Sequence, residues 1–171
     1  MKPPLRIGIF FLTIAISLFL AEFQRANSPI TFGGGGNLKP YEWRDMISCL
    51  LGSQNLRISF STVNGTLTSL YLLNPQGLQE WKDTGTINPI IRIENLSSNI
   101  GIYDIPSRDF YTIVVHNSNN ATEGIHIDLT LYGFEKDLTL AIEIITIIAM
   151  AVPTICFISK KVTAHSHKKE V

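Results

Sequence analysis

The sequence predicts a mainly β fold: an antiparallel β-sandwich ectodomain with an N-terminal signal or anchor helix and a C-terminal transmembrane helix. Three observations indicate it: an apolar run near each end, short stretches of alternating apolar and polar residues between them, and turn residues separating those stretches. The chain has 171 residues, zero formal net charge and 16% charged residues, whereas soluble domains average ~25%. The part between the apolar runs suffices for one domain of ordinary size.

The C-terminal apolar run covers residues 138–159 and ends at two lysines. About 20 apolar residues, at ~1.5 Å each, cross a hydrocarbon layer of ~30 Å, and a spanning helix tolerates a proline such as Pro153. We therefore expect a transmembrane helix here, followed by a cytoplasmic tail over residues 160–171. The lysines that mark the cytoplasmic side are Lys160, Lys161, Lys168 and Lys169.

The N-terminal segment, residues 1–26, has Lys2 and Arg6 ahead of an apolar stretch over residues 7–21. A positive region followed by a short apolar region is the layout of a secretory signal. The stretch is also close to the length of a spanning helix, and no small-x-small cleavage site follows it. A removed signal peptide and a retained anchor both stay open. Either way, the positive flanks predict a single-pass or two-pass membrane protein whose middle part is extracellular or lumenal.

One carboxylate, Glu143, falls inside the C-terminal run. A charged residue within a membrane is a functional candidate by default, but Glu143 is near the outer border, where its side chain could reach the polar interface. The sharper hypothesis uses Arg25, which would lie at the same level if the N-terminal helix is retained. An Arg25–Glu143 pair would then hold the two helices together. Both interpretations stay open.

Residues 27–55 are expected to be a Gly-rich linker followed by an amphipathic helix. Gly33–Gly36 indicate a flexible spacer, because the Lys-Ser/Thr of a phosphate-binding loop is missing. Residues 40–51 carry apolar side chains at helical spacing, with Pro40 at the start and Gly52 after the end. This apolar face would cover the domain, lie on the membrane or dock a partner. Its members are Trp43, Met46, Ile47, Leu50 and Leu51.

Residues 56–137 are expected to form the β-sandwich ectodomain. Residues 57–63 and 66–73 alternate with period two and are joined at Asn64-Gly65, which predicts a hairpin. A short helical turn is expected over residues 75–82, with Leu78 and Trp81 facing inward. Further strands are expected over residues 90–95, 110–117 and 125–134. Several short alternating strands separated by turns are typical of a sandwich.

Three N-glycosylation sequons stand in or beside predicted turns: Asn64-Gly-Thr, Asn95-Leu-Ser and Asn120-Ala-Thr. A glycan needs an exported and exposed asparagine. The motif is weak alone, and its weight comes from agreement with the topology that the lysines indicate.

The stretches around residues 71–85, 93–119 and 125–135 carry a further pattern, in which Tyr111, Val114 and Asn117 share one strand and an alternating strand precedes the C-terminal run. Over about residues 56–134 this pattern resembles the GOLD-type β-sandwich. The resemblance implies a relative of the cargo receptors of the early secretory pathway, which have a signal peptide, a lumenal sandwich, one C-terminal span and a basic tail.

The chain departs from those receptors in two respects. They carry a disulfide in the sandwich and a coiled coil before the span, whereas this ectodomain has one cysteine, Cys49, and continues almost directly into the apolar run that holds Cys156. The last four residues, 168–171, are similar to a Lys-Lys-x-x retrieval signal. A prokaryotic relative, in which the lysines only follow the positive-inside rule, fits these absences and is the interpretation we favour.

Candidate chemistry is sparse. His126 and Asp128 lie at i, i+2 on one strand face, with His116 on another strand, and such residues suit zinc. The polar face of a half-exposed strand would carry the same residues for solvation alone, and this is the interpretation we favour. No Gly-x-Ser-x-Gly, His-Glu-x-x-His or Ser-x-x-Lys motif is present. The mildly acidic ectodomain gives no basic footprint for nucleic acid. Cys49 is expected to be a small buried hydrophobe.

The function expected from these features is non-enzymatic: a membrane-anchored ectodomain that binds a protein or ligand outside the cytosol, or an accessory subunit of a membrane complex. Membrane lipid and a protein are the expected partners, and no metal or cofactor is expected. The alternative is a membrane-bound metal-dependent enzyme that uses His116, His126 and Asp128.

Overall fold

The computed structural model describes the chain from residue 3 to residue 167, and its side chains from residue 3 to residue 159. Lys2, Lys168 and Lys169, with the proposed tail signal, lie outside the described residues, as do the side chains of Lys160 and Lys161. The chain divides into two units: residues 26–135, and a helical unit built from the segments on either side of them. The two units are described separately.

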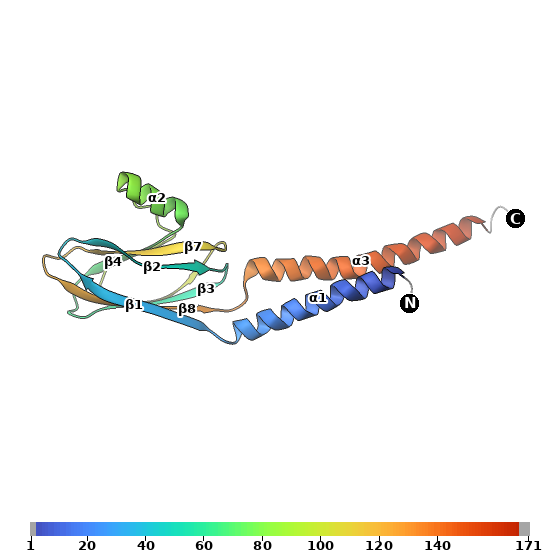
Figure 1. The fold of residues 1–171 in the computed structure, drawn as a ribbon, viewed down its shortest axis with the longest axis horizontal. Helices are drawn as coiled ribbons and strands as arrows, with labels where there is room; N and C mark the ends of the chain where they lie inside the picture. The colour runs from blue at the N-terminus through green and yellow to red at the C-terminus, as the bar shows by residue number, and fades with distance from the viewer. Residues whose placement is uncertain (1–2, 168–171) are drawn as a thin grey trace. The chain divides into compact units, whose positions relative to one another are not determined.

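Residues 26–135 form two four-stranded antiparallel sheets (Figure 1), which confirms the sandwich prediction. Sheet A has the strand order β1-β8-β3-β6, and sheet B the order β2-β7-β4-β5. The strands are β1 (Ile30–Leu38), β2 (Trp43–Leu51), β3 (Asn55–Thr62), β4 (Thr68–Leu73), β5 (Ile91–Leu96), β6 (Ser98–Asp104), β7 (Asp109–Asn117) and β8 (Glu123–Tyr132).

The core lies between the two sheets, and β8 shows how alternation builds it. Ile125, Ile127, Leu129 and Leu131 are buried, as the sequence predicts, while the residues between them face the other side of sheet A. Burying a side chain of this size stabilises the fold by about 1.5–3 kcal/mol. The core residues of the other strands include Leu56, Ile58, Phe60, Leu70, Leu72, Tyr111, Ile113 and Val115.

The Gly-rich stretch is a strand and not a linker, so this prediction is wrong. Gly33–Gly36 lie in β1, which pairs with β8 along its whole length. A Cβ added at Gly33 would stand 2.8 Å from the carbonyl oxygen of Ile127, and one at Gly35 would stand 2.7 Å from that of Ile125. The close approach of β8 therefore requires glycine at these positions.

The amphipathic helix expected over residues 40–51 is also wrong, because this stretch forms β2. The strand pairs antiparallel to β7, with a register shift between Asp45 and Ile47. At this bulge two successive side chains, Met46 and Ile47, both pack against the core. An extra residue in a strand breaks the period of two, and here the resulting spacing of apolar residues imitates that of a helix.

The turn at Asn64-Gly65 connects the two sheets instead of closing a hairpin. β3 pairs with β6 and β8, whereas β4 pairs with β5 and β7. Gly65 has φ +73°, the backbone conformation that makes the dipeptide a turn signal. The turn prediction is confirmed and the pairing prediction is wrong.

The predicted helical turn is α2 (Pro75–Thr84). Asn74 caps it by accepting a hydrogen bond of 2.8 Å from the Gly77 amide, and Pro75 starts the first turn. The helix covers part of the outer face of sheet B, where Leu78 and Trp81 pack against a small apolar cluster. The predicted inward orientation of these two side chains is confirmed.

The helical unit consists of α1 (Pro3–Ala26) and α3 (Lys136–His167). Both are long and apolar enough to cross a membrane by length and composition. Gly8, Ala15 and Glu22 are the buried residues of α1 and recur every seventh residue. A Cβ added at Gly8 would lie 2.5 Å from Pro153 Cγ and 2.8 Å from the Ala149 carbonyl oxygen, so the two backbones approach closely at this small residue.

Both connections to the helices leave the same end of the sandwich, because Ile30 at the start of β1 pairs with Leu131 near the end of β8. We call this the helix-linked end, made of residues 26–30 and 131–135. The opposite end, the far end, carries the loops over residues 39–42, 63–67 and 118–122.

Candidate functional site

An aromatic cluster on the outer face of sheet B is the most organised surface of the sandwich. The ring of Trp43 stacks on His116 with centroids 4.1 Å apart and on Tyr71 with centroids 5.5 Å apart, and lies 6.3 Å from the ring of Trp81. These contacts follow from the register, since Trp43 and His116 are cross-strand partners and α2 supplies Trp81. Trp43 remains 39% exposed, so the cluster presents one face to solvent. We call it the Trp43 cluster.

Charged residues border the Trp43 cluster on β5. The guanidinium carbon of Arg92 lies 5.8 Å from the centre of the Tyr71 ring, close enough for a cation–π contact. Arg92 also pairs with Glu94 at 3.2 Å, and Glu94 accepts a hydrogen bond of 2.9 Å from the Tyr71 hydroxyl. Burial and then this hydrogen bond raise the pKa of Tyr71. Burial lowers the pKa of His116 and so favours the neutral imidazole.

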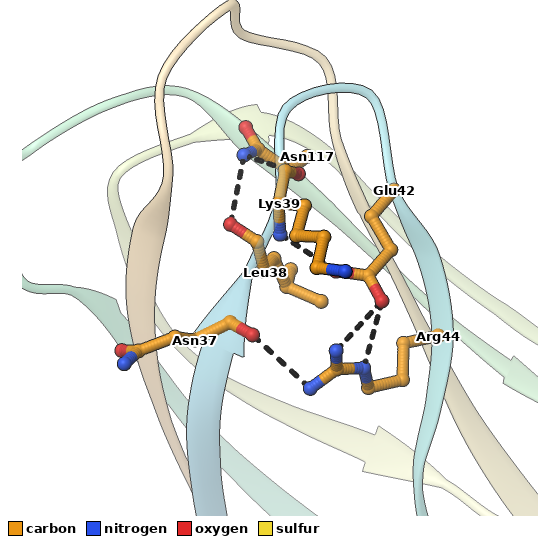
Figure 2. A network of polar contacts seen from close by, with 6 residues as sticks. All are labelled: Asn37, Leu38, Lys39, Glu42, Arg44 and Asn117. Carbon is orange, nitrogen blue, oxygen red and sulfur yellow. Dashed lines mark hydrogen bonds and ion pairs between the residues drawn. The ribbon is translucent and has the colours of Figure 1, made fainter.

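The loop that connects β1 of sheet A to β2 of sheet B leads directly into Trp43, and Glu42 fixes the shape of this loop (Figure 2). Glu42 accepts a hydrogen bond of 2.6 Å from the Lys39 amide and two from the Arg44 guanidinium, at 2.6 and 3.1 Å. The Lys39 amide first, and Arg44 second, lower the pKa of the Glu42 carboxyl. Arg44 also donates to the Asn37 carbonyl at 3.1 Å, which joins the two strands.

Asn117 holds the same loop through its buried side chain (Figure 2). Its side-chain amide donates to the carbonyls of Leu38, Lys39 and Ala121 at 3.4, 3.0 and 2.8 Å. Tyr41, within this loop, has φ +58° and is 64% exposed. The hydrogen-bonded loop and the start of β2 therefore hold two large aromatic residues, Tyr41 and Trp43, toward solvent.

The candidate metal ligands are not brought together. His116 stacks on Trp43 in sheet B, whereas His126 and Asp128 lie on the outer face of sheet A, 3.1 Å apart. Among the described residues, no three His, Cys, Asp or Glu side chains are grouped as a metal site. The His116–His126–Asp128 arrangement proposed for a metal-dependent enzyme is therefore not formed.

All three sequon asparagines are exposed, and all three lie toward the far end. Asn64 is in the turn between β3 and β4, Asn95 is near the end of β5, and Asn120 is in the loop between β7 and β8. Glycosylation at these residues stays a prediction.

Arg25 forms a pair within its own helix. It donates hydrogen bonds of 2.8 and 2.6 Å to the two carboxylate oxygens of Glu22, which is itself buried on the α1 face that carries Gly8 and Ala15. Glu143 is exposed. The Arg25–Glu143 pair stays a prediction.

Cys49 is half-buried against the core, where burial raises the pKa of its thiol to about 11. A thiol of this kind is protonated and unreactive at neutral pH, in keeping with its expected packing role.

A groove on the outer face of sheet A has no counterpart in the sequence predictions. It lies toward the helix-linked end and is lined by residues of β3, β6 and β8 together with the segments over residues 26–29 and 133–134. Its charged residue is Arg57. Ile100 and Ile102 on the edge strand β6 are each 66% exposed beside it. The groove escapes sequence analysis because no strand is expected over the residues of β6.

The Trp43 cluster escapes sequence analysis because the spacing of apolar residues in β2 predicts a helix. The period of two is present on each side of the bulge. Trp43 and Asp45 face outward before it, and Ser48 and Leu50 face outward after it. In the structure, this strand places Trp43 opposite His116 of β7.

The sequence matches no family model and no curated protein. Solved structures with some likeness include the periplasmic inhibitor of g-type lysozyme from Aeromonas hydrophila, with 13% identity, a TM-score of 0.41, and 63% of this chain and 91% of that chain covered. The Yersinia pseudotuberculosis-derived mitogen has 16% identity, a TM-score of 0.43, and coverage of 64% and 92%. The pre-peptidase C-terminal domain of a Bacillus anthracis collagenase has 12% identity, a TM-score of 0.39, and coverage of 60% and 87%. Similarity at this level carries no conclusion about function, and the GOLD-type resemblance stays a prediction.

Proposed function

We propose that this chain is a non-enzymatic, membrane-anchored protein whose β-sandwich binds a protein partner outside the cytosol. The observation that carries the proposal is the Trp43 cluster, a partly exposed aromatic surface with Arg92 at its border. It lies next to the β1–β2 loop, which Glu42 and Asn117 hold in place. Tryptophan, tyrosine and arginine dominate the energetics of protein interfaces. A preorganised surface also loses little conformational entropy on binding.

Anchoring is supported by α1 and α3, which have the length and composition of membrane spans. Lys2, Arg6 and the basic tail favour a cytoplasmic position for both outer ends. The exposed sequons favour an extracellular or lumenal sandwich. The close approach at Gly8 favours a retained N-terminal helix, because a cleaved signal peptide has no need of a fitted partner helix.

Purification of the tagged full chain from its own membranes in a mild detergent tests the proposal. We expect a protein to co-purify at fixed stoichiometry and to be lost in Trp43→Ala and Tyr41→Ala. A central aromatic contributes roughly 2–4 kcal/mol at an interface, so the dissociation constant is expected to weaken by about thirtyfold or more. Tyr41→Ala guards against misfolding, because Tyr41 is 64% exposed.

The matched control is Phe110→Ala. Phe110 is also an aromatic residue of sheet B and is 63% exposed, but it lies at the helix-linked end, opposite Leu50. A partner that binds the Phe110 and Trp43 variants equally would refute the assigned surface. Variable recovery of many proteins, none dependent on Trp43, would refute partner binding by this cluster.

A further inference from the structure

The groove on sheet A has one unusual feature, an arginine without a partner. Among the described residues the guanidinium of Arg57 makes no side-chain hydrogen bond or ion pair, although its backbone lies in a strand that is paired on both sides. Its cross-strand partners are Ile102 on β6 and Thr130 on β8, and neither carries a negative charge. Other arginines of the sandwich differ: Arg44, Arg92 and Arg108 each pair with a glutamate.

The surroundings of Arg57 are apolar. Ile100 and Ile102 are 66% exposed on one side of the groove, and Phe134 is 44% exposed. Tyr132 adds a half-buried aromatic ring. An unpaired guanidinium between aliphatic and aromatic side chains suits a ligand with an anionic group joined to an apolar part.

Chain connectivity places the groove close to both helices, whatever angle the sandwich takes. Ala26 is both the last residue of α1 and a wall of the groove, and Phe134 stands two residues before Lys136, the first residue of α3. A chain extends by at most ~3.6 Å per residue. If α1 and α3 span a membrane, the groove therefore lies at the level of the lipid headgroups, where arginine and aromatic residues are favoured.

We propose that this groove binds the phosphate of a membrane phospholipid, with Arg57 on the phosphate and Ile102 and Phe134 against the glycerol and upper acyl region. The inference rests on the membrane anchoring in the proposed function. Charge complementarity and the position beside both helix ends select the lipid over a soluble peptide.

The test is photo-crosslinking of the full chain in phosphatidylcholine nanodiscs that contain a small fraction of phosphatidylglycerol with a diazirine near its phosphate. We expect label on the segments over residues 98–104 and 130–134. Arg57→Gln is expected to lower that label about threefold to tenfold, as for loss of a charge-assisted hydrogen bond in a partly screened site. Arg57→Lys should keep part of it.

Lys82→Gln is the control, because it removes one positive charge from an exposed position on α2. Equal labelling of the groove in Arg57→Gln and Lys82→Gln, with unchanged thermal unfolding, would overturn the assignment. So would a groove without label in nanodiscs where α1 and α3 are labelled, since the anchoring would then stand and the lipid site would not. Unlabelled helices would instead contradict the anchoring itself.

Labelling in the presence of excess inorganic phosphate distinguishes a site for the phosphate of a lipid headgroup from a site for free phosphate. A lipid site is expected to keep its label, because the bilayer holds the headgroup beside the groove. Loss of the label would indicate a site for free phosphate and would overturn the lipid assignment.

Discussion

Replacing Asn117 with alanine removes the group that joins two loops at the far end of the sandwich, those over residues 39–42 and 118–122. The side-chain amide donates to the carbonyls of Leu38, Lys39 and Ala121, and its oxygen accepts a hydrogen bond of 3.0 Å from the Asn119 amide. Alanine makes none of these bonds. The carbonyl of Leu38, whose residue is fully buried, has no access to water as a substitute.

The expected loss follows from this difference in access to water. A buried group left without a hydrogen bond costs about 1–3 kcal/mol, whereas a bond that water replaces costs about 0.5–1.5 kcal/mol. Lys39 and Ala121 are exposed, so water can replace the hydrogen bonds that their carbonyls lose. Together these contributions predict that Asn117→Ala lowers the free energy of unfolding by about 2–4 kcal/mol.

Urea unfolding of the full chain in detergent, followed by tryptophan fluorescence, measures this loss. Both tryptophans of the chain, Trp43 and Trp81, belong to the Trp43 cluster and report on the sandwich. Asn119→Ala is the control: the Asn119 side chain donates to the carbonyl of the exposed Leu67 and to the Asn117 side-chain oxygen, but it reaches neither Leu38, Lys39 nor Ala121. Because water can replace these bonds, their loss should cost only about 0.5–1.5 kcal/mol. A cost for Asn117→Ala no larger than that of Asn119→Ala would show that Asn117 does not hold these loops together.

Three other perturbations of stability and one of reactivity follow. Gly8→Ile should separate α1 from α3 and lower the thermal stability of the helical unit in detergent, whereas Ala21→Ile, at an exposed position of α1, should not. Two opposing effects act on the pKa of Glu123: burial raises it, and hydrogen bonds, first from the Asn64 amide, lower it. The hydrogen bonds outweigh burial, so the pKa is below its ordinary value of 4.5. Its stabilising contribution is present above that value and is lost as pH falls through the folded pKa; the urea midpoint should fall in acid, and less steeply in Glu123→Gln. Gly34→Ile should cost about 1–3 kcal/mol by overpacking, measured in the same urea assay. Cys49 should react with a thiol reagent at pH 8 much more slowly in the folded chain than in urea, because its folded pKa is about 11.

The strands with undisturbed alternation could be predicted from the sequence. In β8, four apolar residues in register with period two specify both the strand and the face that it buries. β4 and β7 are predictable for a different reason: each is a short apolar run bounded by turn residues, as expected of strands that are buried on both faces. Pairing could not be predicted, because the Asn64-Gly65 turn looks the same whether it closes a hairpin or crosses between sheets.

The candidate site depends on which strands pair with one another, so it could not be predicted from the sequence. Trp43 acquires its partners from β7, β4 and α2, which are distant in sequence. The groove depends in the same way on β6, an edge strand in which exposed isoleucines alternate with half-buried residues. Composition alone predicts the apolar helices, since length and hydropathy suffice to recognise them.

The sequences of β1 and β2 both suggest the wrong local structure, and the cause is the packing of one strand against the other. At the bulge of β2, Met46 and Ile47 both turn toward the core, which places two large side chains where a regular strand would place one. The facing strand of sheet A accommodates them with glycine: a Cβ at Gly34 would stand 3.3 Å from Ile47 Cγ1, and one at Gly36 would stand 3.4 Å from Met46 Cε. The glycines of β1 therefore leave the space that the two inward side chains at the β2 bulge occupy, and the same bulge gives β2 its helix-like spacing of apolar residues. Accordingly, Ile47→Ala should restore part of the stability that Gly34→Ile removes, since the two residues share one space. Additive losses in the double variant would show that the strands do not compensate one another.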